Sequence, residues 1–158
     1  RIALIETGLV FKLPRPPLRR PYPFLLLPVS LGNIKRMKLH FLDFDYSEDE
    51  EGNATWDAIA SVPEARLLEL QHEIIIVLAW AHTEFGHLRA PLELGGLWDY
   101  DLQYERDGCP LLPLSYDADA QHLRPAPQAL AGEHVTLTIS VSGAAVFSEA
   151  FAAQFDLA

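Results

Sequence analysis

The strictest pattern in the sequence is a period of two that runs from Leu97 to Glu105. Alternate residues of a β-strand point to opposite faces of the sheet. Here one face carries Trp98, Tyr100, Leu102 and Tyr104, and the other carries Asp99, Asp101, Gln103 and Glu105. One apolar and one polar face predict a half-buried strand of an antiparallel sheet.

A hairpin is expected directly after this strand. Asp107-Gly108 is a favoured two-residue turn, and the return strand is predicted over about residues 109–116. Pro110 and Pro113 fall within that return strand. Because proline cannot donate a ladder hydrogen bond, the return strand is placed at the edge of the sheet.

A second hairpin is predicted near the middle of the chain. Residues 40–46 alternate Leu42, Phe44 and Tyr46 with Asp43 and Asp45. Gly52-Asn53 can form the turn, and residues 54–61 return with Trp56, Ala58 and Ala60 on one face and Thr55, Asp57 and Ile59 on the other.

A long helix is predicted after this hairpin. Ser61 and Glu64 have the spacing of a capping box, and Pro63 suits a first helical turn. The helix should run to about Phe85 and end at Gly86. Its apolar stripe is Leu67, Leu70, Ile74, Val77, Ala81 and Phe85, at steps of three and four residues.

The end of the chain predicts one more strand and one more helix. Residues 135–141 alternate Val, Leu and Ile with Thr and Ser, and Ser142-Gly143 opens a short helix with Phe147, Phe151 and Phe155. The order ββαβββα favours an α+β two-layer sandwich. We expect an antiparallel sheet of about five strands with two helices on one face.

Charge divides the chain at Met37, the only methionine. Residues 1–36 hold seven basic residues against one acidic residue, a net +6, together with half of the 12 prolines. Residues 37–158 hold five basic and 21 acidic residues, a net −16. The basic segment could be a secretory signal, an arm that docks on the acidic part, or upstream translated sequence. We favour the last, with Met37 as the natural start and residues 37–158 as a single domain.

Composition excludes several classes of protein. A net charge of −10 argues against binding of nucleic acid or an anionic membrane, and no apolar run reaches the roughly 20 residues that span a bilayer. A single Cys excludes a disulfide framework and a cysteine-based zinc site. We expect a cytoplasmic location, and the lysine-poor composition, rich in Ala, Leu, Arg and Pro, suggests a bacterial genome rich in GC.

The sequence contains no complete catalytic motif. His82-Thr83-Glu84 matches part of the zinc-deaminase signature, but the paired cysteines of that signature are absent. His72-Glu73 begins like a zinc-protease helix, but Ile76 stands at the second ligand position. No phosphate-binding loop or dinucleotide fingerprint occurs. We therefore predict no catalytic residue and no cofactor, and an enzyme is the less favoured interpretation.

The candidate site is a set of four aspartates, Asp43, Asp45, Asp99 and Asp101. If their two strands are neighbours, the carboxylates should lie within about 5–8 Å of one another and repel. A basic partner protein would relieve that repulsion, which makes a non-catalytic binding module the leading hypothesis. The alternatives are a divalent-cation-dependent domain or enzyme that uses the same carboxylates, and acids that only keep one sheet face solvated.

Overall fold

The structure is a computed structural model, and it describes residues 35–157. The predictions for residues 1–34 therefore lie outside the described residues. Chain contacts separate Asn33–Ala158 as one compact unit, and all that follows concerns that unit. None of the described helices is long and apolar enough to cross a bilayer.

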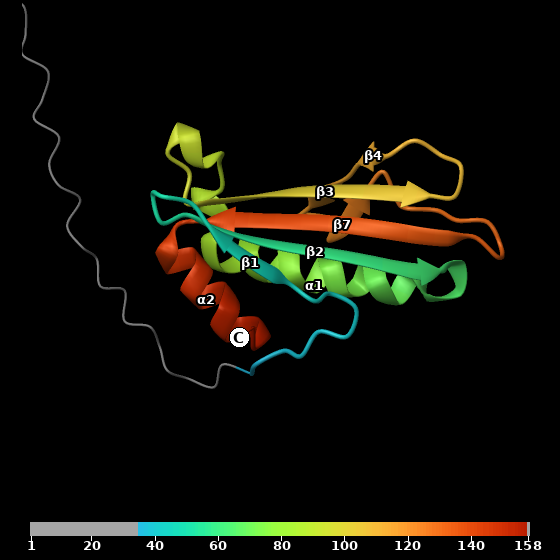
Figure 1. Ribbon diagram of the computed structural model, residues 1–158, viewed down its shortest axis with the longest axis horizontal. Coiled ribbons are helices and arrows are strands. Elements are labelled where there is room, and N and C mark those ends of the chain that lie inside the picture. Colours follow the sequence, from blue (N-terminus) through green and yellow to red (C-terminus); the bar gives the residue numbers. More distant parts are fainter. Residues whose placement is uncertain (1–34, 158) are drawn as a thin grey trace, which may run out of the picture. The chain divides into compact units, whose positions relative to one another are not determined.

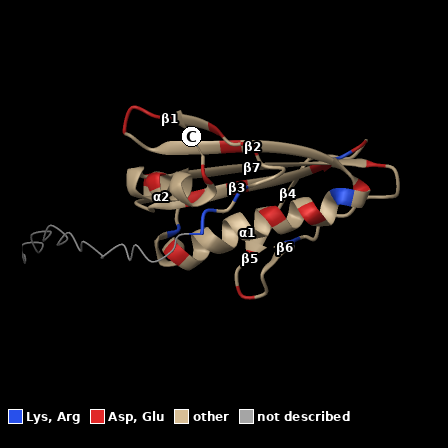
Figure 2. Ribbon diagram, turned by 90° about the horizontal axis from the view of Figure 1, so that it is seen from below, with Lys and Arg blue, Asp and Glu red and all other residues tan. Residues whose placement is uncertain are grey.

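The fold is a two-layer α+β sandwich, as predicted (Figure 1). Five antiparallel strands form the main sheet in the order β1-β2-β7-β3-β4, and a separate two-stranded sheet pairs β5 with β6. Both long helices lie on the same face of the main sheet, and within residues 35–157 no α-helix covers the opposite face, which we call the open face (Figure 2). The main-sheet strands are β1 (Asp45–Glu48), β2 (Ala54–Pro63), β3 (Trp98–Arg106), β4 (Leu112–Pro113) and β7 (His134–Gly143), the small-sheet strands are β5 (Ser115–Asp117) and β6 (His122–Arg124), and the helices are α1 (Leu67–Phe85) and α2 (Ala145–Phe155).

The core lies between the sheet and the helices. Period-two strands supply one wall, and α1 supplies the other with Leu70, Ile74, Val77 and Leu78, which are completely buried. The three Phe side chains of α2 add an aromatic layer, in which the Phe147 ring stacks on that of Trp98 at 5.2 Å. Burial of this α1 stripe explains why the β-branched residues Ile74–Val77 form helix here rather than strand.

The first helix does not begin at the predicted capping box. Ser61 pairs with Thr136, and Pro63 with His134, so β2 continues through both residues. Three residues of 3-10 helix, Glu64–Arg66, follow before α1 starts at Leu67 without a side-chain cap. Pairing with β7 takes precedence over local capping because it buries Val62 against the core. The helix ends at Phe85, as predicted, and a second 3-10 turn, Gly86–Leu88, follows.

Two strand predictions also needed correction. Residues 40–44 are not part of a strand, since β1 starts at Asp45. The return strand predicted for residues 109–116 is split into β4 and β5, and β5 pairs with β6, which the sequence did not reveal. The prolines do mark a sheet edge, because β4 is the outermost strand beyond β3.

Candidate functional site

The open face of the main sheet is the candidate site. The side chains that alternate with the buried core residues point to this face, and it carries no Lys or Arg at an outward position of the described strands. These positions are Asp45 and Ser47 on β1; Thr55, Asp57, Ile59, Ser61 and Pro63 on β2; His134, Thr136, Thr138, Ser140 and Ser142 on β7; Asp99, Asp101, Gln103 and Glu105 on β3; and Pro113 on β4.

One row across this face is strongly acidic. Asp45 pairs with Asp57, Asp57 pairs with Ser140, and Ser140 pairs with Asp101 in the strand register. Directly opposed residues have Cβ atoms about 5 Å apart, so Asp45 and Asp57 face each other as like charges. The Ser140 hydroxyl donates a hydrogen bond to Asp57 and separates it from Asp101. We call Asp45, Asp57, Asp99 and Asp101, with Ser140 and Ser142 between them, the acidic face.

The predicted adjacency of the two aspartate-bearing strands is wrong. Both β2 and β7 lie between β1 and β3, so Asp45 and Asp101 are three strand spacings apart, about 14 Å. The outward direction predicted for Asp45, Asp99 and Asp101 is correct. Asp43 is exposed in the segment before β1 and is not part of the sheet.

Asp57 is the carboxylate that the sequence reasoning missed. It lies opposite Asp45, at the position where the predicted adjacency would put Asp99 or Asp101. The signal was available, because Asp57 alternates with Trp56 and Ala58 and the hairpin turn fixes which residues of the two strands oppose each other.

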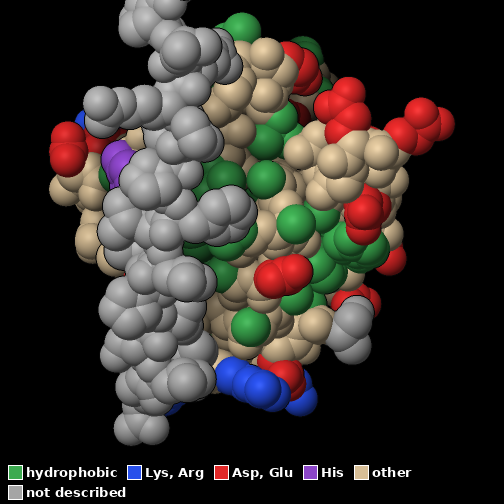
Figure 3. Space-filling view, turned by 90° about the vertical axis from the view of Figure 1, so that its left-hand side faces the viewer, with side chains coloured by type: hydrophobic (Ala, Val, Ile, Leu, Met, Phe, Trp, Pro, Cys, Tyr) green, Lys and Arg blue, Asp and Glu red, His purple; other side chains and the backbone are tan. Residues whose placement is uncertain are grey.

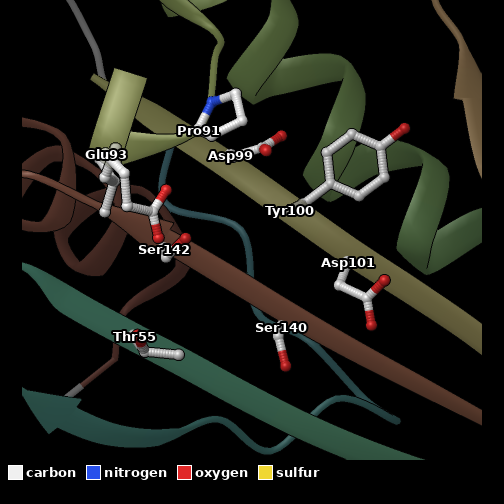
Figure 4. A pocket seen from close by; sticks show the side chains of 9 residues that line it. Thr55, Pro91, Glu93, Asp99, Tyr100, Asp101, Ser140 and Ser142 are labelled. Carbon is white, nitrogen blue, oxygen red and sulfur yellow. The ribbon is translucent and has the colours of Figure 1, made fainter. Parts of the chain in front are cut away.

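A shallow cavity of about 270 Å³ opens at one end of the acidic face. A 3-10 turn, Leu92–Leu94, overhangs the sheet there and brings Glu93 toward Ser142 (Figure 4). Tyr100 contributes to the wall, but its side chain points to the helix layer. The lining residues are Thr55, Pro91, Leu92, Glu93, Asp99, Tyr100, Asp101, Ser140 and Ser142.

A cation borders this cavity beside Asp99. The Arg89 guanidinium lies 2.9 Å from the Asp99 carboxylate and 4.5 Å from the centre of the Tyr100 ring. Asp101 has no such partner among the described residues and instead accepts a 2.7 Å hydrogen bond from Gln103. Asp45, Asp57 and Asp101 are therefore the carboxylates of the acidic face whose charge no described cation balances within ion-pair distance.

The acidic character extends to the end of the molecule next to α2. In Figure 3, which views this end of the molecule, acidic side chains are spread over the upper and right-hand parts, between hydrophobic ones. Lys and Arg gather mainly at the lower margin. Part of the negative charge counted in the sequence is thus exposed on this face.

His82, Glu84 and His87, the histidine and glutamate side chains near the end of α1, lie in different surroundings. The His82 ring packs 5.2 Å from Trp98 and 5.3 Å from Tyr116, whereas Glu84 and His87 are exposed. Burial, and secondarily Arg89, lower the pKa of His82 below its ordinary value. Within residues 35–157 no three His, Cys, Asp or Glu side chains converge as ligands for a cation would. Asp45 and Asp101 are also too far apart to share an ion, whose ligands lie at about 2.3–2.6 Å.

Comparisons with known proteins returned no family model, no curated protein and no solved structure that matches this chain.

Proposed function

We propose that this protein is a non-catalytic binding module that recognises a basic protein partner through the acidic face of its sheet. The observation that carries the proposal is the row Asp45, Asp57, Ser140 and Asp101, which lies on the sheet face that neither described α-helix covers. A surface of this kind attracts a positively charged partner over long range and favours its association.

Unbalanced charge supports the proposal. Asp45 and Asp57 oppose each other without a described cation between them, and like charges in directly opposite positions destabilise a sheet. A lysine or arginine from a partner would relieve that repulsion. Arg89 is an example, within this protein, of a cation bound at this face, since its guanidinium pairs with Asp99 and lies over the ring of Tyr100.

The exposed apolar side chain of Ile59 adds a second kind of contact. Ile59 is 70% exposed on the open face, next to Asp57 and opposite Thr138. An apolar residue surrounded by acidic and hydroxyl side chains suits a partner that is basic at its margin and apolar at one point, as in protein interfaces with a small apolar centre and a polar rim.

Binding of a fluorescent oligolysine peptide tests the proposal. Asp57→Asn/Asp101→Asn removes two charges from the acidic face with almost no change in shape, and the amide oxygen introduced by Asp57→Asn can still accept the hydrogen bond from Ser140. Glu84→Gln/Glu149→Gln removes the same charge from exposed positions on α1 and α2 and is the matched control.

We expect the acidic-face variant to bind the peptide about tenfold more weakly, measured by fluorescence anisotropy, and the control to lose much less. Affinity of the wild-type protein should also fall steeply as salt rises, because exposed charges are screened. Equal losses in the two variants, or binding that does not respond to salt, would contradict a role for the acidic face.

A further inference from the structure

The two edges of the main sheet differ in whether they can accept another strand. At one edge, β4 has only two residues, and one of them is Pro113, which has no N–H group to donate. At the other edge, β1 has four exposed residues without proline, and among the described residues it pairs only with β2. The unpaired side of β1 is therefore the edge at which backbone hydrogen bonds can be added.

The turn that follows β1 shows which of its backbone groups are free. The Asp49 N–H donates to the Asn53 carbonyl, which makes these two residues a hydrogen-bonded pair of the hairpin. Such pairs alternate along an antiparallel ladder. The backbone N–H and C=O groups of Asp45 and Ser47 therefore point toward β2. Those of Tyr46 and Glu48 point away from β2, toward the unpaired edge of the sheet.

Both ends of β1 are held in place before any partner arrives. The Glu73 carboxylate on α1 accepts hydrogen bonds of 2.8 Å from the backbone of His40, Phe41 and Leu42, just before the strand. After the strand, the Asp49 carboxylate accepts hydrogen bonds from the backbone N–H groups of Glu51 and Asn53. An edge that is already ordered loses little conformational entropy when a second strand pairs with it.

Charge decides what kind of strand can pair with this edge. Residues 43–51 contain six acidic residues and no basic one. Antiparallel pairing of two copies of β1 about Ser47 would place Asp45 of one copy opposite Asp49 of the other, and pairing about Tyr46 would place Asp43 opposite Asp49. Since like charges across a ladder are destabilising, a second copy is disfavoured and a basic strand is favoured.

We infer that β1 is a docking edge for an extended basic segment of the partner protein, which pairs with the free backbone groups of Tyr46 and Glu48. The inference rests on the proposed function and specifies how the partner binds. In the added strand, the side chains on the open face of the sheet lie beside Asp45 and Ser47 and are basic. Residues on the helix side lie beside Tyr46, which is 51% exposed and packs 4.8 Å from Trp56, and are apolar.

The test uses the whole protein and two synthetic peptides. The first alternates lysine with valine. The second has the same sequence but carries N-methyl groups on every second backbone nitrogen, so it keeps the charge and loses the donors along one edge. Because either edge of the first peptide could face β1, N-methylation of the other set of nitrogens provides a third peptide.

We expect the unmodified peptide to slow hydrogen exchange of the Tyr46 and Glu48 amides. At least one methylated peptide should bind about tenfold more weakly, because it loses backbone hydrogen bonds to β1. Equal binding of all three peptides, with loss of binding in Asp57→Asn/Asp101→Asn, would overturn the docking edge and leave the proposed function standing. No binding of any of these peptides or of oligolysine would remove both.

Discussion

The backbone N–H of Leu42 donates a 2.8 Å hydrogen bond to Oε1 of Glu73, which lies 31 residues later on α1. The same carboxylate also accepts from Phe41 and His40, and it is only 7% exposed. Three consecutive N–H groups around one carboxylate leave it well satisfied inside the fold. This contact fixes the course of the chain into β1.

Glu73→Ala should therefore lower the free energy of unfolding by roughly 3 kcal/mol. Each buried donor left without a partner costs about 1–3 kcal/mol, and two of the three donors are only partly buried. Denaturant unfolding monitored by tryptophan fluorescence measures the change. Glu84→Ala, an exposed position on the same helix, is the control and should stay within about 0.5 kcal/mol of the wild type. An unchanged stability for Glu73→Ala would show that the contact is not formed.

A buried hydrogen bond links the sheet to α2. The Trp56 indole N–H donates to the Ser148 hydroxyl at 3.0 Å, and both residues are buried. A double-mutant cycle of Trp56→Phe and Ser148→Ala should give a coupling energy of about 1 kcal/mol, as for a typical buried hydrogen bond. The single variants also change packing volume, which the cycle cancels. Strictly additive effects would mean that the two groups do not interact in solution.

Local patterns in the sequence predicted the elements whose side chains alternate most regularly. The period of two from Leu97 to Glu105 and from residue 135 to 141 became β3 and β7, because burial of one face is what defines those strands. The Phe residues of the last helix were likewise found by their spacing. The fold class follows from these elements and their order.

Non-local contacts account for what the sequence did not predict. Residues 40–46 are predicted as one strand, but the Glu73 carboxylate accepts the N–H groups of residues 40–42, so these groups are not available to a ladder. Ser61 and Glu64 have capping-box spacing, but Thr136 pairs with Ser61. No local pattern in the sequence indicates that β7 inserts between β2 and β3, and β2 and β7 together separate Asp45 from Asp101. A binding role for Asp43, Asp45, Asp99 and Asp101 stays a prediction.

Stability should fall in mildly acidic solution because of His82. Burial lowers the pKa of His82, and its Nε2 is buried without a described hydrogen-bond partner. The unfolded chain therefore binds a proton at His82 more readily than the folded one. The stability that neutral His82 contributes is fully present above the ordinary His pKa of about 6.5, and it is lost as the pH falls below that value. We expect the free energy of unfolding to drop more between about pH 7 and pH 5 in the wild type than in His82→Gln. The same pH dependence in both proteins would exclude His82 as the source.

The turn that overhangs the acidic face depends on a glycine. A Cβ added to Gly96 would lie 1.8 Å from the Ala90 carbonyl oxygen and 2.4 Å from its carbon, both backbone atoms that cannot move aside alone. The Gly96 N–H also donates to the Pro91 carbonyl, and the Ala90 N–H donates to the Trp98 carbonyl, so the loop is held close to the start of β3.

Gly96→Ala should displace residues 90–95, lower the free energy of unfolding by about 2 kcal/mol or more, and open the cavity beside Glu93. Gly108→Ala is the comparison, since a Cβ there meets no atom within 4 Å and only its positive φ of 70° carries a cost, about 1 kcal/mol. Thermal unfolding measures both variants, and a Gly96→Ala protein no less stable than Gly108→Ala would show that the loop does not approach β3 this closely.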